Sequence, residues 1–161
     1  MSSNFLVRRA TTADLPALGK LGAMLIREHH AFDPKRFMQP RGDPEEGYAW
    51  FLGTQLQEAD VAVFVAERNG AVIGYLYAGV EPLSWKELRD EAGFIHDIVV
   101  DPDNRRLGVG SVLIEAACDW FRSIGAPRVV LWTAEKNGKA QHLFESRGFR
   151  RTMIEMTREL K

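Results

Sequence analysis

Apolar residues in the first third of this 161-residue chain recur at helical spacing. Leu15, Leu18, Leu21 and Leu25 fall three or four positions apart, which predicts an amphipathic helix reaching about Glu28. Thr11 or Thr12 precedes it as a candidate cap, and Pro16 is then confined to the first turn. A loop follows over residues 31–44, which contain three prolines, and a second helix is predicted over residues 45–58.

Strand-like segments rich in β-branched and aromatic residues dominate the rest of the chain. The dipeptide Asn69-Gly70 separates two of them and is the strongest short signal for a hairpin, because both residues tolerate a positive φ. Further helices are predicted over residues 111–122 and 139–147, the second closing on Gly148. Strands are predicted over residues 5–8, 61–67, 72–80, 94–100, 128–133 and 151–158.

The order of these elements is βααβββαβαβ, with a hairpin-bearing sheet first and two α/β crossovers after it. We found no internal repeat, low-complexity tract or linker. The sequence therefore predicts one domain over residues 1–161, of a mixed α/β (α+β) class.

Composition narrows the functional classes. Lys and Arg total 21 against 22 Asp and Glu, which argues against nucleic-acid binding through a basic surface. The single Cys118 excludes a disulfide-stapled secreted module, and no apolar run approaches the roughly 20 residues of a membrane span. The N-terminal residues lack the apolar core of a secretory signal. We therefore expect a soluble cytoplasmic protein that binds neither nucleic acid nor membrane.

The most informative stretch is residues 95–111, IHDIVVDPDNRRLGVGS. A strand runs into a turn with Arg105 and Arg106, then Gly108 and Gly110, then a helix. Glycines allow close backbone approach, while the helix N-terminus and the arginines favour a phosphate. Leu113 stands where a dinucleotide fingerprint has its third glycine, and no Walker lysine follows. Taken alone, such a turn is either an anion site or purely structural.

About thirty residues later a second motif follows, Asn137-x-x-Ala140-x-x-Leu143-Phe144-Glu145-x-x-Gly148-Phe149. Together with Arg105-x-x-Gly108-x-Gly110 it resembles the GCN5-related N-acetyltransferases, the GNAT superfamily. The resemblance covers residues 94–150. It implies a mostly antiparallel central sheet flanked by helices, with a splayed parallel pair of strands forming an acetyl-CoA cleft.

The resemblance also assigns the residues that would bind acetyl-CoA as co-substrate. The backbone of the central strand would pair with the pantetheine arm, the amides of the loop would hold the pyrophosphate, and an asparagine would bond the arm from the other side. At these positions the chain has Ile98, Val99 and Val100, then Arg105, Arg106, Leu107, Gly108, Val109, Gly110 and Ser111, and finally Asn137.

The implied reaction is direct attack of an amine on the acetyl thioester in a ternary complex. An alkylammonium has a pKa near 10.4, so it needs a base or a water relay. By period two His96 shares a strand face with Ile98 and Val100, and the arylalkylamine acetyltransferases carry a histidine there. It is either this base or a half-buried structural histidine. Glu81 is the second candidate and Glu155 a weaker third, while Asp97 is expected on the opposite face.

One position departs from the family pattern. Many members place there a tyrosine that protonates the departing thiolate, and this chain has Phe144, which donates no proton. A thiol of pKa about 8.5 still leaves unaided. Tyr75, Tyr77 or a water are the alternatives for a donor, and Phe144 is read as packing in its helix core.

Acceptor-binding residues are implied from the first helices, their following loop and the final strands. The candidates at these places are His29, His30, Tyr77, Trp85 and Trp132. Four of them have a purely structural alternative: the two histidines as a helix C-terminus, Tyr77 as core or surface packing, and Trp85 as an exposed lid residue or a dimer contact. Adjacent histidines lack the spacing of a helical zinc pair, so no metal is expected.

Three functions are compatible with these residues. The first is an N-acetyltransferase for the primary amine of a small molecule, and the second an acetyltransferase for a protein or peptide. The third is a non-catalytic acyl-CoA-binding regulatory module. A homodimer is a family-level expectation.

Overall fold

The computed structural model describes residues 4–161 and contains four helices and five strands in that range. The helices are α1 (Leu15–Phe32), α2 (Pro44–Gln55), α3 (Val109–Ser123) and α4 (Gly138–Ser146). The strands are β1 (Leu6–Arg9), β2 (Val61–Arg68), β3 (Ala71–Glu81), β4 (Ala92–Val100) and β5 (Val129–Leu131). The predicted elements before residue 148 are therefore confirmed, with ends displaced by a few residues.

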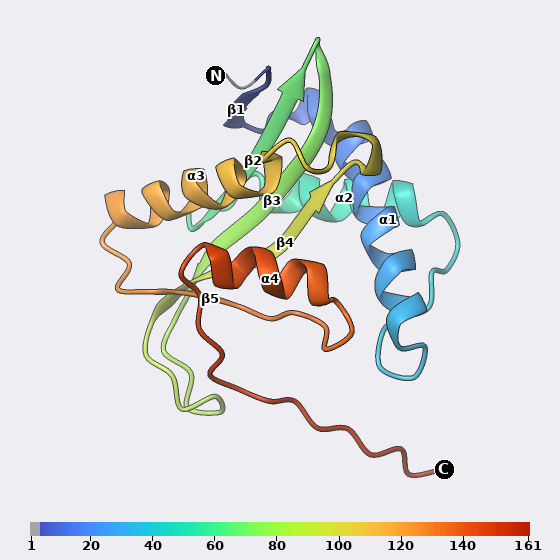
Figure 1. Ribbon diagram of the computed structural model, residues 1–161, viewed down its shortest axis with the longest axis vertical. Coiled ribbons are helices and arrows are strands. Elements are labelled where there is room, and N and C mark those ends of the chain that lie inside the picture. The colour runs from blue at the N-terminus through green and yellow to red at the C-terminus, as the bar shows by residue number, and fades with distance from the viewer. Residues whose placement is uncertain (1–3) are drawn as a thin grey trace.

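The strands form one sheet in the order β1-β2-β3-β4-β5, as Figure 1 shows. The first three pairings are antiparallel, and β4 and β5 run parallel. Asn69 and Gly70, with φ of 52° and 78°, form the predicted tight turn between β2 and β3. This topology confirms the predicted mixed, mostly antiparallel sheet with one parallel pair.

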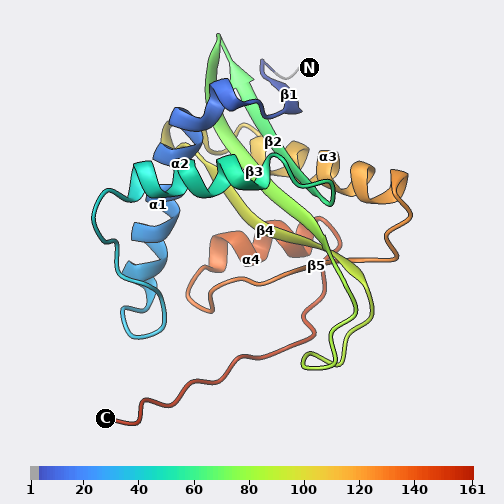
Figure 2. The same cartoon turned by 180° about the vertical axis from the view of Figure 1, so that it is seen from behind.

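Helices cover both faces of the sheet, α1 and α2 on one and α3 and α4 on the other (Figures 1 and 2). Each face has its own buried cluster. Leu18 and Leu52 from α1 and α2 pack on Val65 and Tyr75. On the other face Leu113 and Phe121 of α3 pack among the residues of the second cluster. Successive side chains of each strand point to opposite faces of the sheet, so the same strands contribute residues to both buried clusters.

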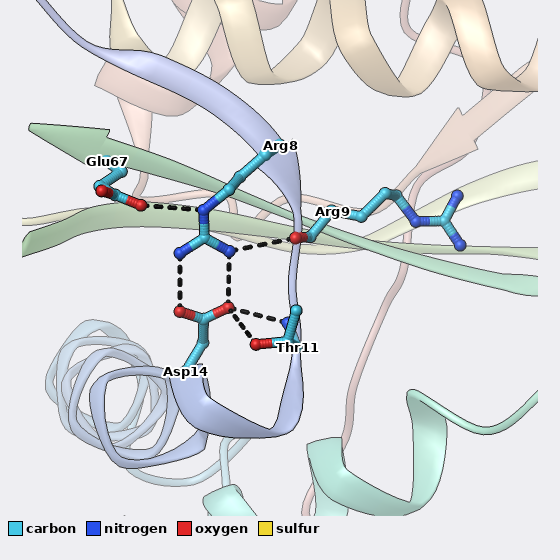
Figure 3. A network of polar contacts seen from close by, with 5 residues as sticks. All are labelled: Arg8, Arg9, Thr11, Asp14 and Glu67. Carbon is cyan, nitrogen blue, oxygen red and sulfur yellow. Dashed lines mark hydrogen bonds and ion pairs between the residues drawn. The ribbon is translucent and has the colours of Figure 1, made fainter. Parts of the chain in front are cut away.

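Arg8 at the N-terminal edge strand connects three elements (Figure 3). Its guanidinium donates to both carboxylate oxygens of Asp14, at 2.8 and 2.9 Å, and to Glu67 of β2 at 2.8 Å. The backbone N–H of Thr11 donates to the same Asp14 carboxylate at 2.8 Å. The network fixes β1 to β2 and to the start of α1, which follows a short 3-10 turn at Thr12–Asp14.

The predicted last strand over residues 151–158 is wrong. Residues 150–161 have no regular secondary structure and are exposed throughout. They run out from the body as an extended chain in both views (Figures 1 and 2). The alternation typical of a strand is present in the sequence, but a strand needs a neighbour to pair with, and within residues 4–161 none lies beside this segment.

Over the part of the chain described here, no helix combines the length and the apolar character that a membrane span requires.

Candidate active site

An irregularity in β4 determines where His96 points. Tyr77 of β3 pairs with Asp97, but the next residue, Ala78, pairs with Ile95. His96 is therefore an extra residue in its strand, a β-bulge. The bulge interrupts the alternation of side chains, so that His96 lies against Tyr77 with ring centroids 4.8 Å apart.

This arrangement corrects two predictions. His96 does not share a face with Ile98, which packs with the α3 side of the sheet. It shares the face of Tyr77, which packs with α1 and α2. Asp97 bonds to a tyrosine on that same side, so it does not point away from His96. Strict period two fails here because one extra residue shifts every later side chain to the other face.

The two predicted base candidates lie together. His96 Nε2 is 3.1 Å from Glu81 Oε1, and the two side chains are 29% and 41% exposed. Glu81 ends β3, where it pairs with Ala92 of β4, and its side chain reaches the bulged residue His96. A histidine paired with a carboxylate and open to solvent on one side can accept a proton and be stabilised once charged.

A pocket of about 260 Å³ lies over this pair. Its lining consists of Glu81, Glu87, Arg89, Phe94, Ile95, His96 and Trp132. The Phe94 ring stacks on His96 with centroids 5.8 Å apart and meets the Trp132 ring edge-on at 6.2 Å. Two carboxylates, one guanidinium and three aromatic rings thus surround one small volume.

Sequence reasoning missed four members of this lining, Glu87, Arg89, Phe94 and Ile95. Arg89 lies 4.8 Å over the Phe94 ring and donates to Glu87 at 2.8 Å. This hydrogen bond lowers the pKa of Glu87. The charged loop between β3 and β4 was visible in the sequence, but no local pattern indicates which of its side chains turns inward.

A buried polar cluster supports the bulge from below. The phenols of Tyr48 on α2 and Tyr75 on β3 both donate to the Asp97 carboxylate, the second at 3.0 Å. Burial raises the pKa of Asp97, against the two phenol hydrogen bonds that lower it. Burial, followed by the Asp97 charge, raises the pKa of both phenols. The tyrosines therefore stay protonated and hold Asp97 in place beside His96.

Tyr77 lies between this cluster and the pocket. It is buried, and its hydroxyl donates to Gln55 Oε1 at 2.6 Å. Burial, with smaller contributions from Asp97 and Glu81, raises the pKa of Tyr77 to about 12. Its ring, and not its hydroxyl, is the part that meets His96.

Of the other predicted acceptor residues, Trp132 lines the pocket and three do not. His29 Nδ1 is bonded to the Leu25 carbonyl at 2.9 Å, and its ring packs edge-on against Phe37 at 5.0 Å. His30 Nδ1 lies 3.3 Å from the Phe37 carbonyl. Trp85 is 84% exposed in the β3–β4 loop. These contacts agree with the structural alternative for His29 and His30, in which the two histidines only form the C-terminal end of α1.

The predicted donor loop follows the other end of β4. Gly108 has φ of 81°, the left-handed conformation that favours glycine, and no atom lies within 4 Å of the place its Cβ would take. α3 begins one residue later, at Val109. Arg105 donates from Nε to the Val100 carbonyl at 3.0 Å. The loop thus presents an exposed backbone and two arginines at a helix N-terminus, an arrangement that attracts phosphates.

Beside this loop the sheet opens. β5 pairs only with Gly93–Ile95 of β4. Among residues 4–161, no strand therefore neighbours the predicted pantetheine positions Ile98, Val99 and Val100 on that side. Asn137 caps α4, its side-chain oxygen accepting from the Ala140 N–H at 3.2 Å. The cap leaves the amide nitrogen of Asn137 as a donor.

Phe144 is 6% exposed and packs against Phe149 with ring centroids 6.0 Å apart. It belongs to the cluster that α3 and the sheet bury. The aromatic ring at this position is therefore part of the core, as expected for a residue with no proton to donate.

The chain matches the acetyltransferase (GNAT) family over residues 24–149, most of its length. It belongs to that family. The family supports the enzyme class predicted from the sequence, an N-acetyltransferase that depends on acetyl-CoA.

Two relatives show how far the likeness extends. A mycothiol acetyltransferase of Thermomonospora curvata is 34% identical over 119 residues, which cover 70% of this chain and 37% of that protein. An uncharacterized N-acetyltransferase of Bacillus subtilis is 29% identical over 145 residues, which cover 89% of this chain and 88% of the other. The chain thus spans little more than a third of the first relative and most of the second.

Solved structures of low identity share the fold. A mutant of a Bacillus halodurans protein superposes with a TM-score of 0.81 at 20% identity, covering 97% of this chain and 99% of that one. An aminoglycoside N-acetyltransferase in complex with CoA gives 0.75 at 21% identity, covering 100% and 98%. At such identities the likeness concerns the fold alone.

Proposed function

We propose that this protein transfers the acetyl group of acetyl-CoA to a primary amine of a small molecule, by direct attack within a ternary complex. The observation that carries the proposal is the His96–Glu81 pair at the bulge of β4, inside a pocket of about 260 Å³. The same strand ends at the glycine loop proposed to hold the donor.

The donor side is supported by features that fit a coenzyme A arm and its phosphates. The free edge of β4 offers backbone N–H and C=O groups to an extended amide chain. The proposed phosphate contacts are the loop amides of residues 105–111, aided by Arg105 and Arg106. Gly108 leaves that surface open, because nothing lies where its Cβ would stand.

On the acceptor side, the carboxylate of Glu81 favours a cationic amine, whereas that of Glu87 is already paired with Arg89. The Phe94 and Trp132 rings can pack against the amine. The His96–Glu81 pair removes one proton from the ammonium, directly or through a water. The imidazole takes that proton and Glu81 stabilises the charged ring. The amine lone pair then forms the new C–N bond as the C–S bond of the thioester breaks, and the acetylated nitrogen releases its second proton to water, which leaves a neutral amide.

No tyrosine replaces Phe144 as a proton donor in this proposal. Tyr75 donates to Asp97 and Tyr77 to Gln55, so both hydroxyls are engaged within the protein. The sulfur therefore leaves as a thiolate and takes its proton from water, which slows the step without preventing it.

The proposal also includes the predicted domain organisation, cellular location, oligomeric state and partners. We propose one domain over residues 1–161, a cytoplasmic location, a homodimer, and the absence of metal, membrane and nucleic-acid partners.

The donor site is tested by calorimetric titration with acetyl-CoA, with ATP as a comparison ligand. We expect micromolar binding of acetyl-CoA, roughly −8 kcal/mol, and its loss in Gly108→Val. Gly125→Val is the matched control, because Gly125 also has a positive φ and open space but lies at the other end of α3. No binding by the unaltered protein would refute the donor site.

The acceptor side is tested by measuring thiol release over a panel of small amines and peptides. His96→Ala is expected to lower kcat by about 10²–10⁴-fold and to leave acetyl-CoA affinity unchanged. Glu81→Gln is expected to lower kcat less, and His142→Ala, an exposed histidine on α4, is the control. Turnover unaffected by His96→Ala would remove the base assignment. Transfer to peptides alone, or to no amine, would favour one of the two alternative functions.

A further inference from the structure

The loop between β3 and β4 encloses a second hollow beside the acceptor pocket. The loop extends beyond the sheet (Figures 1 and 2), and the hollow inside it has a volume of about 410 Å³. Glu81, Glu87 and Arg89 line both this hollow and the pocket over His96. The two volumes therefore adjoin, and an acceptor whose amine lies at Glu81 extends past Arg89 into the loop.

Arg89 is held in place at the boundary between the two volumes. Its backbone exchanges two hydrogen bonds with Ser84 across the loop, at 2.8 and 3.1 Å. Its guanidinium carbon lies 4.8 Å from the centroid of the Phe94 ring, and the same ring stacks on His96 at 5.8 Å. The proposed base and this cation thus contact one ring, which fixes their separation.

The guanidinium of Arg89 has one edge that is only partly used. A guanidinium offers five N–H donors in a rigid fork. Nη1 donates to the Asp90 carbonyl at 2.7 Å, and Nη2 donates to a carboxylate oxygen of Glu87 at 2.8 Å. Nε is buried and meets no acceptor among residues 4–161. Since a buried N–H without an acceptor is costly, the Nε–Nη2 edge favours a further ligand.

A carboxylate is the group that matches this edge. Its two oxygens accept two parallel hydrogen bonds from a guanidinium, whereas Glu87 uses only Oε2, on Nη2. The Glu87 side chain is 40% exposed, and an ion pair of that exposure adds little to stability. An incoming carboxylate can therefore displace Glu87 toward solvent and accept from Nε and Nη2 together.

We propose, building on the function proposed above, that the acceptor is an amine that also carries a carboxylate, as an amino acid does, and that Arg89 selects it. The ammonium lies at Glu81 and His96, and the carboxylate lies on the Nε–Nη2 edge of Arg89. Lys86, which lines the hollow in the loop, adds positive charge on the same side. A zwitterion thus meets negative charge at one end of the site and positive charge at the other.

Acetyl transfer to amino acids and to their own primary amides measures this preference. The panel contains glycine, β-alanine and γ-aminobutyrate, and each amide keeps the shape of its acid and lacks the charge. At least one acid is expected to exceed its amide in kcat/KM by about 10–100-fold, the range of hydrogen bonds to a charged group.

Arg89→Lys keeps the charge but loses the paired donors, so it is expected to remove most of this ratio. Arg122→Lys is the matched control, the same change in an exposed ion pair on α3, and keeps the ratio. Circular dichroism verifies the fold of both variants. A loss of activity in Arg89→Lys that is equal for acid and amide overturns the proposal, because Arg89 then acts only on the structure of the loop.

Removal of the competing carboxylate is expected to have the opposite effect. Glu87→Gln should lower KM for the preferred acid about two- to fivefold, because an exposed ion pair no longer has to be broken. It should not lower KM for the amide. An unchanged KM for the acid overturns the proposal, and this variant decides if Arg89→Lys does not fold.

Calorimetric titration separates the carboxylate site from the proposed acetyl transfer. Each acid and amide of the panel is titrated into protein saturated with coenzyme A, so that no transfer takes place. Tighter binding of an acid than of its amide, lost in Arg89→Lys, supports the carboxylate site even if no amine is acetylated. Transfer to amines with no preference for any acid overturns the carboxylate site and leaves the proposed function standing.

Discussion

At the scale of single residues, Asp14 shows how a carboxylate is buried when hydrogen-bond donors pair with it. It is 7% exposed, yet both carboxylate oxygens accept from Arg8 and one also accepts from the Thr11 backbone. The hydrogen bonds from Arg8 are the largest cause that lowers the pKa of Asp14, against its burial, which raises it. The ionised form is therefore the one that the fold stabilises.

We predict that Asp14→Asn lowers the free energy of unfolding by about 2 kcal/mol at neutral pH, the size of hydrogen bonds to a charged group. Because the folded-state pKa of Asp14 is lowered, its contribution is complete above the unfolded-state pKa near 3.9 and is lost as the pH falls through the folded value. The gap between wild type and variant is thus expected to be constant above about pH 5 and to close in acid.

Urea unfolding at a series of pH values measures this gap. Arg122→Gln is a suitable control, since the Arg122–Asp119 pair is 69% and 76% exposed, and we expect a change below about 0.5 kcal/mol. A gap for Asp14→Asn that stays the same down to pH 2 would contradict the assignment.

His96 marks the limit of residue-level prediction from sequence. His96 and Glu81 were predicted as base candidates from their strand positions and a family resemblance, and the structure places the two side chains next to each other. The face was wrong because a bulge adds one residue without any local sequence signal. Tyr48 was missed as a partner of Asp97 because it comes from α2, 49 positions away in sequence.

At the scale of elements, α1 and α2 approach closely where α1 has glycines. A Cβ on Gly19 would lie 2.4 Å from the Glu45 carbonyl oxygen, and one on Gly22 would lie 2.1 Å from the Tyr48 ring. The absence of side chains at these two positions brings α2 near enough to the sheet for Tyr48 to reach Asp97. Helix packing and the geometry of the bulge are thereby connected.

Two substitutions with the same chemistry are expected to have opposite effects. Gly22→Ala drives a methyl group into the half-buried Tyr48 ring and should destabilise the protein by about 1–3 kcal/mol. Gly47→Ala lies within α2 with nothing inside 4 Å, so it should stabilise by about 0.5–1 kcal/mol through helix propensity. Thermal unfolding of both variants checks this, and equal shifts would contradict the close contact.

Most elements were predictable because their signals are local. The Asn69-Gly70 turn, the α1 leucines and the glycine that closes α4 each act within a few residues. The segment after residue 150 has a strand pattern and forms none within residues 4–161. Alternating apolar and polar residues show that a segment is able to form a strand. Whether it does so depends on a free sheet edge beside it, which the local sequence does not reveal.

At the scale of the whole molecule, β5 pairs only with Gly93–Ile95 of β4, which leaves an opening in the strand pairing on the way to the glycine loop. A ligand that fills this opening binds only the folded chain, because the free β4 edge and the loop exist only there. Binding is therefore linked to global stability.

We predict that acetyl-CoA at a hundred times its Kd stabilises the fold by about 2.7 kcal/mol. For a chain of this size that is a rise in Tm of about 5–10 °C. Differential scanning fluorimetry with and without acetyl-CoA measures the shift, with ATP giving a smaller one. Gly108→Val should abolish the response and Gly125→Val should keep it; a response retained by both would place the ligand elsewhere.

β4 carries the acceptor end and the donor end of the proposed site on one short stretch of backbone. From His96 to Val100 the strand rises about 3.3 Å per residue, so the base and the start of the donor loop are a fixed distance apart. Exchanging side chains around the pocket leaves that spacing intact, whereas inserting or deleting a single residue changes it and turns the base away. Across evolution or in protein engineering, this stretch should tolerate new side chains, and hence new acceptors, but not a new length.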